Sequence, residues 1–349
     1  MSTVPAYAAR TAGAPLAPFP IERRAPGPDD VQIEILYCGV CHTDIHMARD
    51  DWGGSTFPMV PGHEIVGRVS ATGASATGFR VGDRVGVGCF VDSCRGCEPC
   101  RDGQEQYCDE GMVATYNGRE RDTGAPTFGG YSSRIVVDHR YVLPIPDGLP
   151  PERAAPLLCA GITTWSPLRQ FGVVAGHRVA VIGLGGLGHM AVKLAVALGA
   201  EVTVLSSSPA KRDDALALGA HDFAATGDGR AFKSHRGQFD LILDTVSAPH
   251  DLNACLGLLR LDGTMVLLGL PAPTPVAAHA LVSRRRRLAG SLIGGIAETR
   301  EMLAFCAAHG IAADVELIAI DQVDRAWERM LAGDVRYRFV IDMASLRGA

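Results

Sequence analysis

The hydrophobic positions of this chain follow two different patterns. Residues 1–150 contain short apolar stretches broken by Gly and Pro, and residues 31–37 (VQIEILY) alternate apolar and polar positions. Such alternation predicts a half-buried strand, and many short strands with glycine turns predict a small twisted β-barrel. From residue 177 onward, continuous apolar runs alternate with helix-length segments, which predicts a doubly wound parallel sheet.

The pattern changes again near residue 297. Residues 299–310 predict a helix that ends at a glycine, residues 321–331 an amphipathic helix, and residues 334–343 a final strand. A chain of 349 residues is long enough for two domains. We therefore predict an α/β protein whose first domain comprises residues 1–155 and 297–349 and whose second comprises residues 156–296.

Composition narrows the class of protein. A hydrophobic content of 47% supports a large core, and a net charge of −5 argues against nucleic acid as the main partner. The four arginines at 284–287 could be taken for a basic patch, but they precede a predicted strand and are interpreted as a solvated face or loop. No apolar run reaches the roughly 18 residues of a membrane span, and prolines interrupt the N-terminal segment where a signal peptide needs an apolar helix. A cytoplasmic location is expected.

Four closely spaced cysteines form the strongest local motif. They are Cys94, Cys97, Cys100 and Cys108, with the spacing C-x2-C-x2-C-x7-C. Four thiolates saturate a tetrahedral zinc ion, which makes the site structural, in a lobe of about residues 89–110. An iron–sulfur cluster is one alternative, although no proline follows the last cysteine, and a disulfide pair is the other, which a reducing compartment disfavours. The remaining thiols outside ligand patterns are interpreted as core residues: Cys38, Cys89, Cys255 and Cys306.

A second candidate metal segment runs from residue 39 to residue 64. It begins GVCHTDIH and ends PGHE, and it supplies Cys41 and His63. Thiolate and imidazole are ligands that zinc prefers, and a site with three protein ligands keeps a fourth position for water or substrate. Taken singly, either residue has the simpler interpretation of an ordinary buried side chain.

A glycine motif lies between a predicted strand and a predicted helix, which is the context of a dinucleotide site. Its backbone and the helix N-terminus suit a pyrophosphate. The motif comprises Gly183, Gly185, Gly186, Leu187 and Gly188.

The next strand ends in Ser206, Ser207 and Ser208, followed by Lys211, where an NAD enzyme usually carries an acid. Hydroxyls and a cation bind a 2′-phosphate, so NADP is predicted. The alternative is a serine-rich turn before a solvated helix. Later strand ends that should border the cofactor contribute Thr245, Val246 and Gly269.

Taken together, GVCHTDIH, PGHE, the cysteine lobe, the glycine motif and RYRFVID resemble the zinc-dependent medium-chain alcohol dehydrogenases. More narrowly, they resemble the cinnamyl alcohol dehydrogenase branch and its bacterial NADP-dependent aldehyde reductases. The resemblance implies a GroES-like catalytic domain and a Rossmann domain with the active site between them. It also implies Cys159 as the third catalytic zinc ligand, Glu64 behind or on the zinc, and a helix containing Thr163 over the cofactor.

The same resemblance assigns roles around the metal. Thr43 and His46 should relay the alcohol proton, and Asp44 should orient His63; helix capping by Thr43 and a helix-start role for Asp44 are the alternatives. Trp52 and Phe90 are candidate walls of an apolar substrate pocket, with core packing as the alternative. Ala114 stands where the plant lignin enzymes carry Trp, which widens the pocket. Residues 287–295 imply a homodimer.

The predicted function is reversible hydride transfer between NADP(H) and primary alcohols or aldehydes, with two zinc ions per chain. Aromatic or medium aliphatic aldehydes are the expected substrates. One alternative is an NAD-linked zinc polyol dehydrogenase, which would favour an acid at Ser206 or Ser207. Another is a non-catalytic NADP-binding sensor or structural protein, which would lack the catalytic ligands.

Overall fold

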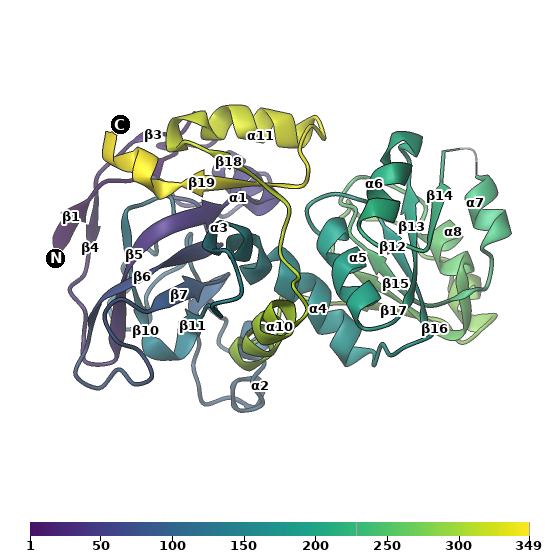
Figure 1. The fold of residues 1–349 in the computed structure, drawn as a ribbon, viewed down its shortest axis with the longest axis horizontal. Coiled ribbons are helices and arrows are strands. Elements are labelled where there is room, and N and C mark those ends of the chain that lie inside the picture. The colour runs from purple at the N-terminus through teal and green to yellow at the C-terminus, as the bar shows by residue number, and fades with distance from the viewer. Residues whose placement is uncertain (228, 349) are drawn as a thin grey trace. The chain divides into compact units, whose positions relative to one another are not determined.

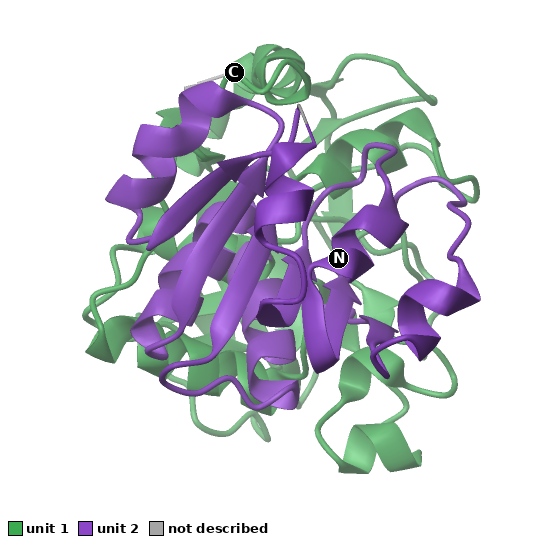
Figure 2. Cartoon of the chain, turned by 90° about the vertical axis from the view of Figure 1, so that its right-hand side faces the viewer, with its two compact units in different colours: residues 1–159, 294–349 green, residues 160–293 purple. Residues whose placement is uncertain are grey.

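The computed structural model describes residues 1–227 and 229–348. The chain forms two compact units, Met1–Cys159 with Gly294–Ala349 and Ala160–Ile293 (Figure 2). The first unit continues past the boundary expected after residue 155 and includes Cys159. Within the described residues, no helix is both long and apolar enough to span a bilayer.

A seven-stranded sheet in the order β11-β7-β6-β5-β19-β18, with β10 also on β5, organises the first unit (Figure 1). Strand β5 (Asp30–Gly39) confirms the strand predicted from residues 31–37, and it buries Val31, Ile33 and Ile35. Its length lets it pair antiparallel with β6, β10 and β19. The other strands of the unit are β1 (Ser2–Val4), β2 (Tyr7–Ala8), β3 (Ala17–Pro18), β4 (Ile21–Arg23), β6 (Ile65–Thr72), β7 (Arg84–Val87), β8 (Phe90–Asp92), β9 (Val113–Ala114), β10 (Arg134–Asp138), β11 (Leu143–Pro144), β18 (Val315–Ile318) and β19 (Arg338–Asp342).

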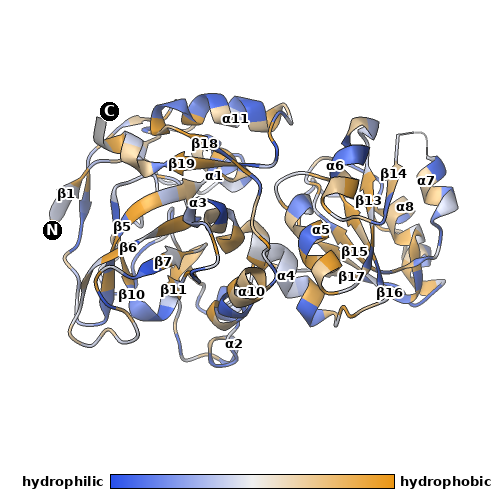
Figure 3. Cartoon of the chain, in the orientation of Figure 1, coloured by the Kyte–Doolittle hydropathy of each residue, from blue (hydrophilic) through white to orange (hydrophobic). Residues whose placement is uncertain are grey.

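Helices of the first unit confirm the predicted C-terminal elements. Helix α11 (Val323–Leu331) buries Val323, Ala326, Trp327 and Met330, and its alternating polar and apolar colouring is visible in Figure 3. This is the amphipathic pattern read from the sequence. The other helices are α1 (His42–Arg49), α2 (Glu98–Arg101), α3 (Pro151–Ala154), α10 (Ile296–Ala308), η1 (Glu105–Tyr107), η2 (His139–Tyr141), η3 (Ala155–Leu158), η5 (Ile320–Gln322) and η6 (Met343–Gly348).

The second unit is a six-stranded parallel sheet in the order β14-β13-β12-β15-β16-β17, which confirms the predicted doubly wound fold. Its strands are β12 (Arg178–Ile182), β13 (Glu201–Ser206), β14 (Asp222–Ala225), β15 (Phe239–Asp244), β16 (Leu259–Leu267) and β17 (Arg287–Gly290). Its helices are α4 (Ala160–Gln170), α5 (Gly188–Ala197), α6 (Arg212–Ala217), α7 (Arg230–Ser234), α8 (Leu252–Gly257), α9 (Ala278–Val282) and η4 (Pro209–Lys211).

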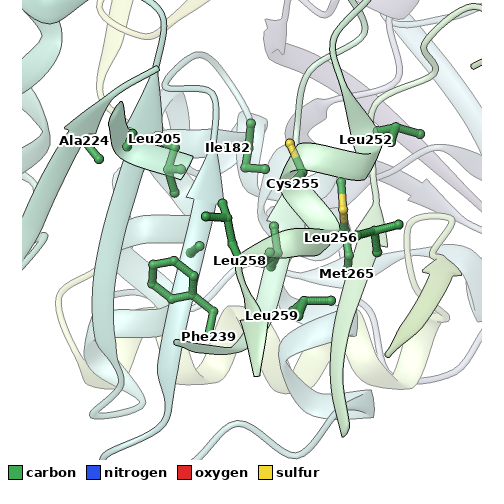
Figure 4. Close-up of a cluster of buried hydrophobic side chains, with 13 residues drawn as sticks. Ile182, Leu205, Ala224, Phe239, Leu252, Cys255, Leu256, Leu258, Leu259 and Met265 are labelled. Carbon is green, nitrogen blue, oxygen red and sulfur yellow. The ribbon is translucent and has the colours of Figure 1, made fainter. Parts of the chain in front are cut away.

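Continuous apolar strands are explained by burial on both faces of this sheet. Figure 4 shows part of the core on one face, where Phe239, Leu258 and Met265 pack with residues of α8. The rigid sheet brings the ends of β12, β13, β15 and β16 to one edge, where the cofactor residues were predicted.

Candidate active site and metal centres

Donor atoms from three separate segments converge in the first unit. Cys41 precedes α1, His63 and Glu64 precede β6, and Cys159 follows η3. Their Sγ, ring nitrogen and carboxylate oxygen atoms all lie within 4.8 Å of one another. Two thiols and an imidazole at this spacing form a donor set that fits a zinc ion. The structure therefore brings together all four predicted residues of the catalytic metal site.

Asp44 fixes the geometry of this donor set. Its carboxylate accepts hydrogen bonds from Cys41 N (2.9 Å) and Gly62 N (3.1 Å), and it lies 3.3 Å from His63 Nδ1. Engagement of Nδ1 leaves Nε2 of His63 as the nitrogen that can ligate. Asp44 therefore has both of the positions considered for it, because its carboxylate contacts the His63 ring and it lies in the first turn of α1.

The two thiols of the set differ in acidity, because the hydrogen bond between them lowers the pKa of Cys41 and raises the pKa of Cys159. A hydrogen bond with Cys159 holds the pKa of Cys41 well below its usual range, against the effect of burial, and His63 acts in the same direction. The thiolate is the form of cysteine that binds metal. This environment therefore favours the ionised Cys41 that a metal site requires.

Arg338 is a site residue whose partner, Glu64, sequence analysis did not identify. It is 4% exposed and forms a buried ion pair with Glu64, which is 0% exposed. Arg338 is therefore a buried residue of β19 and not a surface charge. Burial raises the pKa of Glu64 to about 7, although Arg338 opposes this shift. Oxygen Oε2 of Glu64 is buried without a hydrogen-bond partner among the described residues, so it is free to act as a donor toward a metal.

Gly39 leaves the space that Glu64 occupies. A Cβ at Gly39 would lie 1.9 Å from Glu64 Oε2 and 2.9 Å from its Cβ. We expect Gly39→Ala to displace the Glu64 side chain and to destabilise the fold by about 1–3 kcal/mol, as overpacking does. Urea unfolding measures the change. The control is Gly257→Ala, where a Cβ meets no atom within 4 Å; equal midpoints for both variants would contradict the prediction.

The predicted proton-relay residues lie on α1. Cys41 is the N-cap of this helix, so the capping role considered for Thr43 is wrong. Thr43 Oγ1 lies 3.6 Å from Cys41 Sγ. His46 Nδ1 is 2.8 Å from Asp51 Oδ2, and Trp52 stacks on the His46 ring with centroids 4.8 Å apart. Asp51 was not identified from sequence, because an acid five residues after a histidine has no distinctive pattern.

The two candidate pocket residues differ in position. Trp52 is 45% exposed and its ring contacts His46, which places Trp52 beside the predicted relay residue. Phe90 is 3% exposed and packs edge-on against Tyr141, with ring centroids 5.8 Å apart. The core-packing alternative therefore describes the observed environment of Phe90.

The cysteine lobe forms a second donor set. Cys94, Cys97, Cys100 and Cys108 place their sulfur atoms within 4.8 Å of one another. Cys94 Sγ accepts hydrogen bonds from the backbone amides of Gly96 (3.4 Å) and Cys97 (3.3 Å), which lower the pKa of Cys94 to about 7. Four thiols with amide donors aimed at sulfur fit a closed tetrahedral zinc site.

The glycine motif adopts the conformation that a dinucleotide site needs. Gly183 has φ +90°, and a Cβ at Gly188 would lie 2.1 Å from Gly183 O, so the turn and the start of α5 both require glycine. A Cβ at Gly185 would meet no atom within 4 Å, which shows an open approach to the backbone there. Leu187 is the N-cap residue of α5 and Gly186 precedes it.

Other predicted cofactor residues surround this motif. Lys211 Nζ donates to Leu184 O (2.8 Å), which joins the predicted phosphate-binding segment to the glycine turn. Ser206 ends β13 and its Oγ accepts from Ser208 N (3.2 Å), while Ser207 is exposed. Thr245 Oγ1 donates to Ile182 O (2.8 Å). The remaining predicted residues are Val246 and Gly269, which approach each other closely, and Thr163, which lies on α4 packed against α5.

Comparison with known proteins identifies the class. The alcohol dehydrogenase GroES-like domain family matches residues 27–147, and the zinc-binding dehydrogenase family matches residues 186–308. NADP-dependent alcohol dehydrogenase C 1 of Mycolicibacterium smegmatis is 59% identical over 99% of this chain and 100% of that protein. A cinnamyl alcohol dehydrogenase structure from Sorghum bicolor has 47% identity and a TM-score of 0.96, covering 98% of each chain. The Helicobacter pylori enzyme complexed with NADP(H) has 42% identity and a TM-score of 0.93, covering 98% of each chain.

This chain belongs to the zinc-dependent medium-chain alcohol dehydrogenases, in the branch that contains the cinnamyl alcohol dehydrogenases. It is an oxidoreductase with a GroES-like domain and a Rossmann domain. The family assignment drawn from the sequence motifs is confirmed.

Proposed function

We propose that this enzyme interconverts aldehydes and primary alcohols with NADP(H), and that it mainly reduces aromatic or medium aliphatic aldehydes. The convergence of Cys41, His63 and Cys159 around one point, with Asp44 fixing the His63 ring, carries this proposal. The NADP-dependent relative and the NADP(H)-bound structure support the cofactor. A cytoplasmic location and a homodimer remain predictions from the sequence.

A zinc ion at the catalytic donor set would polarise the carbonyl oxygen as a Lewis acid, and NADPH would supply the hydride. The chain's own residues then have distinct tasks. Asp44 holds the imidazole of His63 in one orientation, and Glu64 offers a further oxygen to the metal. A second zinc held by the four lobe cysteines would brace a segment that has few apolar residues of its own.

Proton delivery falls to Thr43 and His46. The Thr43 hydroxyl lies 3.6 Å from Cys41 Sγ, so it would be near a substrate oxygen at the metal site and could donate a proton to that oxygen. Asp51 holds Nδ1 of His46, so Nε2 is the nitrogen that can exchange a proton. Half-buried His46 and exposed Asp51 connect this pathway to solvent.

Cofactor choice rests on the end of β13. The hydroxyls of Ser207 and Ser208 and the Lys211 ammonium can bind a 2′-phosphate, and no carboxylate occupies residues 206–211 to repel it. Lys211 is held against the glycine turn by its hydrogen bond to Leu184 O, so its charge lies next to the phosphate-binding backbone.

The decisive experiment measures NADPH and NADH oxidation with benzaldehyde and cinnamaldehyde, before and after chelation and after zinc is restored. We expect rapid NADPH oxidation, loss on chelation, recovery with zinc, and little reaction with NADH. Equal rates with both cofactors would overturn the NADP assignment. Full activity in metal-free protein would overturn the zinc assignment, and no turnover in protein that contains two zinc ions would overturn the substrate class.

A further inference from the structure

The ring of Tyr116 lies against the ring of His63, and sequence analysis did not identify this tyrosine. The two ring centroids are 5.8 Å apart and the ring planes differ by 27°, so the rings are stacked. This separation is within the range of about 4.5–7 Å in which aromatic rings attract each other. Tyr116 is 5% exposed and His63 is 4% exposed, so the contact is buried.

His63 is thus held by two contacts that restrict different motions. Asp44 lies 3.3 Å from Nδ1, at the edge of the imidazole. A contact at one nitrogen fixes one point of the ring and leaves the ring able to tilt about that point. A ligating nitrogen directs its lone pair in the plane of the imidazole, so a tilt would turn Nε2 away from the metal. The Tyr116 ring lies on the face of the imidazole and opposes this tilt.

The segment that carries Tyr116 is fixed on both sides of the ring. Thr115 N donates to Cys89 O (3.1 Å). Asn117, which has φ +56°, accepts hydrogen bonds at Oδ1 from Thr56 N (2.9 Å) and Thr56 Oγ1 (3.0 Å). A side chain can orient a metal ligand only if its own position is fixed, and these contacts supply that support.

Tyr116 contacts His63 through its ring. Its hydroxyl is buried and makes no hydrogen bond to a described residue, although Asp44, after burial, contributes to the raised pKa of Tyr116. A buried hydroxyl without a partner costs free energy. Phenylalanine should therefore replace tyrosine at this position without loss, whereas an aliphatic side chain should not.

We propose that Tyr116 is a positioning residue for the catalytic metal, and that its ring keeps the His63 imidazole in the plane that zinc binding requires. The inference rests on the proposed role of His63 as a zinc ligand. Residues that orient a ligating histidine typically change metal affinity by about 10–100-fold when they are removed. The lobe site has four thiol donors and no imidazole, so the same change should leave its zinc in place.

The test compares unmodified protein, Tyr116→Leu and Tyr116→Phe, each loaded with zinc, in competition with a chromogenic chelator. In Tyr116→Leu, we expect one of two zinc ions to bind about 10–100-fold more weakly and the other to be retained. The retained zinc also shows that the lobe is still folded. Tyr116→Phe should keep both zinc ions with unmodified affinity. The visible spectrum of cobalt-substituted protein should change in Tyr116→Leu and not in Tyr116→Phe, because it reports the ligand geometry.

Tyr7→Leu is the matched control, since it truncates another buried tyrosine of the same unit, and both of its zinc ions should bind as in unmodified protein. The proposal is overturned if Tyr116→Leu binds both zinc ions as tightly as unmodified protein. Equal weakening in Tyr116→Phe would overturn it too, because the hydroxyl and not the ring would then act, and equal weakening in Tyr7→Leu would show a general loss of packing. A single zinc in unmodified protein would instead contradict the proposed catalytic site itself.

Discussion

His63→Ala is expected to lower kcat/KM for aldehyde reduction by roughly 10³-fold or more, because several kcal/mol of charge stabilisation depend on the catalytic zinc. Its zinc content should fall from about two ions per chain to about one, since the lobe cysteines are unchanged. His63 is buried, and Asp44 orients its ring. No other imidazole among the described residues belongs to this donor set. Steady-state kinetics and metal analysis on the same preparation measure both effects.

The matched control is His309→Ala, since His309 is an exposed histidine of the same unit that contacts Phe305. NADPH binding, followed by cofactor fluorescence, should persist in the His63 variant, because the predicted cofactor residues all lie in the second unit. Two zinc ions per chain together with near-normal kcat/KM would exclude His63 as a catalytic ligand.

Features contained in one short segment were predictable from the sequence. The lobe cysteines lie within fifteen residues, and the glycine motif lies within six. At that range, the spacing of the residues largely determines which atoms can meet. Strand β5, the parallel sheet and helix α11 were predictable for a similar reason, since each depends on a periodic pattern of buried positions.

Arg338 shows what the sequence could not reveal. Strand β19 pairs antiparallel with β5 so that Val340 lies opposite Gly39, and Val40 N donates to Phe339 O (2.9 Å). This register, between segments about three hundred residues apart, brings Arg338 to Glu64. A charged residue in a strand has no sequence signal for such a partner, and an exposed position is the usual expectation.

Cys89 and Phe90 show a different limit. Both residues are close in sequence to the metal lobe, but Cys89 lies in a bend just before β8, so strand alternation does not give the direction of its side chain. Phe90 was assigned to the substrate pocket, whereas the structure packs it on Tyr141. Cys89 was interpreted as a core thiol, whereas it is half-buried and its Sγ lies 3.7 Å from Leu158 O. A strand of three residues gives too little alternation to predict either position.

Arg338→Met is expected to destabilise the protein by about 3–5 kcal/mol at alkaline pH, because it leaves Glu64 buried without its partner. Burial opposes the ionisation of Arg338, but Glu64, and Cys41 and Cys159 when they are ionised, raise the pKa of Arg338. Removing the guanidinium should therefore raise the pKa of Glu64 beyond its present value of about 7.

The sign of the pH dependence follows from that shift. A carboxyl whose folded pKa lies above its unfolded value loses stability as pH rises toward the folded pKa, and the loss then stops. In the unmodified protein the loss ends near pH 7, whereas in Arg338→Met it continues to higher pH. The deficit should thus be small near pH 6 and should grow above pH 7.

Glu64→Gln combined with Arg338→Met should recover most of the alkaline deficit, and exposed Arg325→Met should show none. Urea unfolding between pH 6 and alkaline pH measures the difference in free energy of unfolding between Arg338→Met and the unmodified protein. A difference that does not change with pH would contradict the prediction, because it would mean that lost packing, and not an unpaired carboxylate, destabilises the variant.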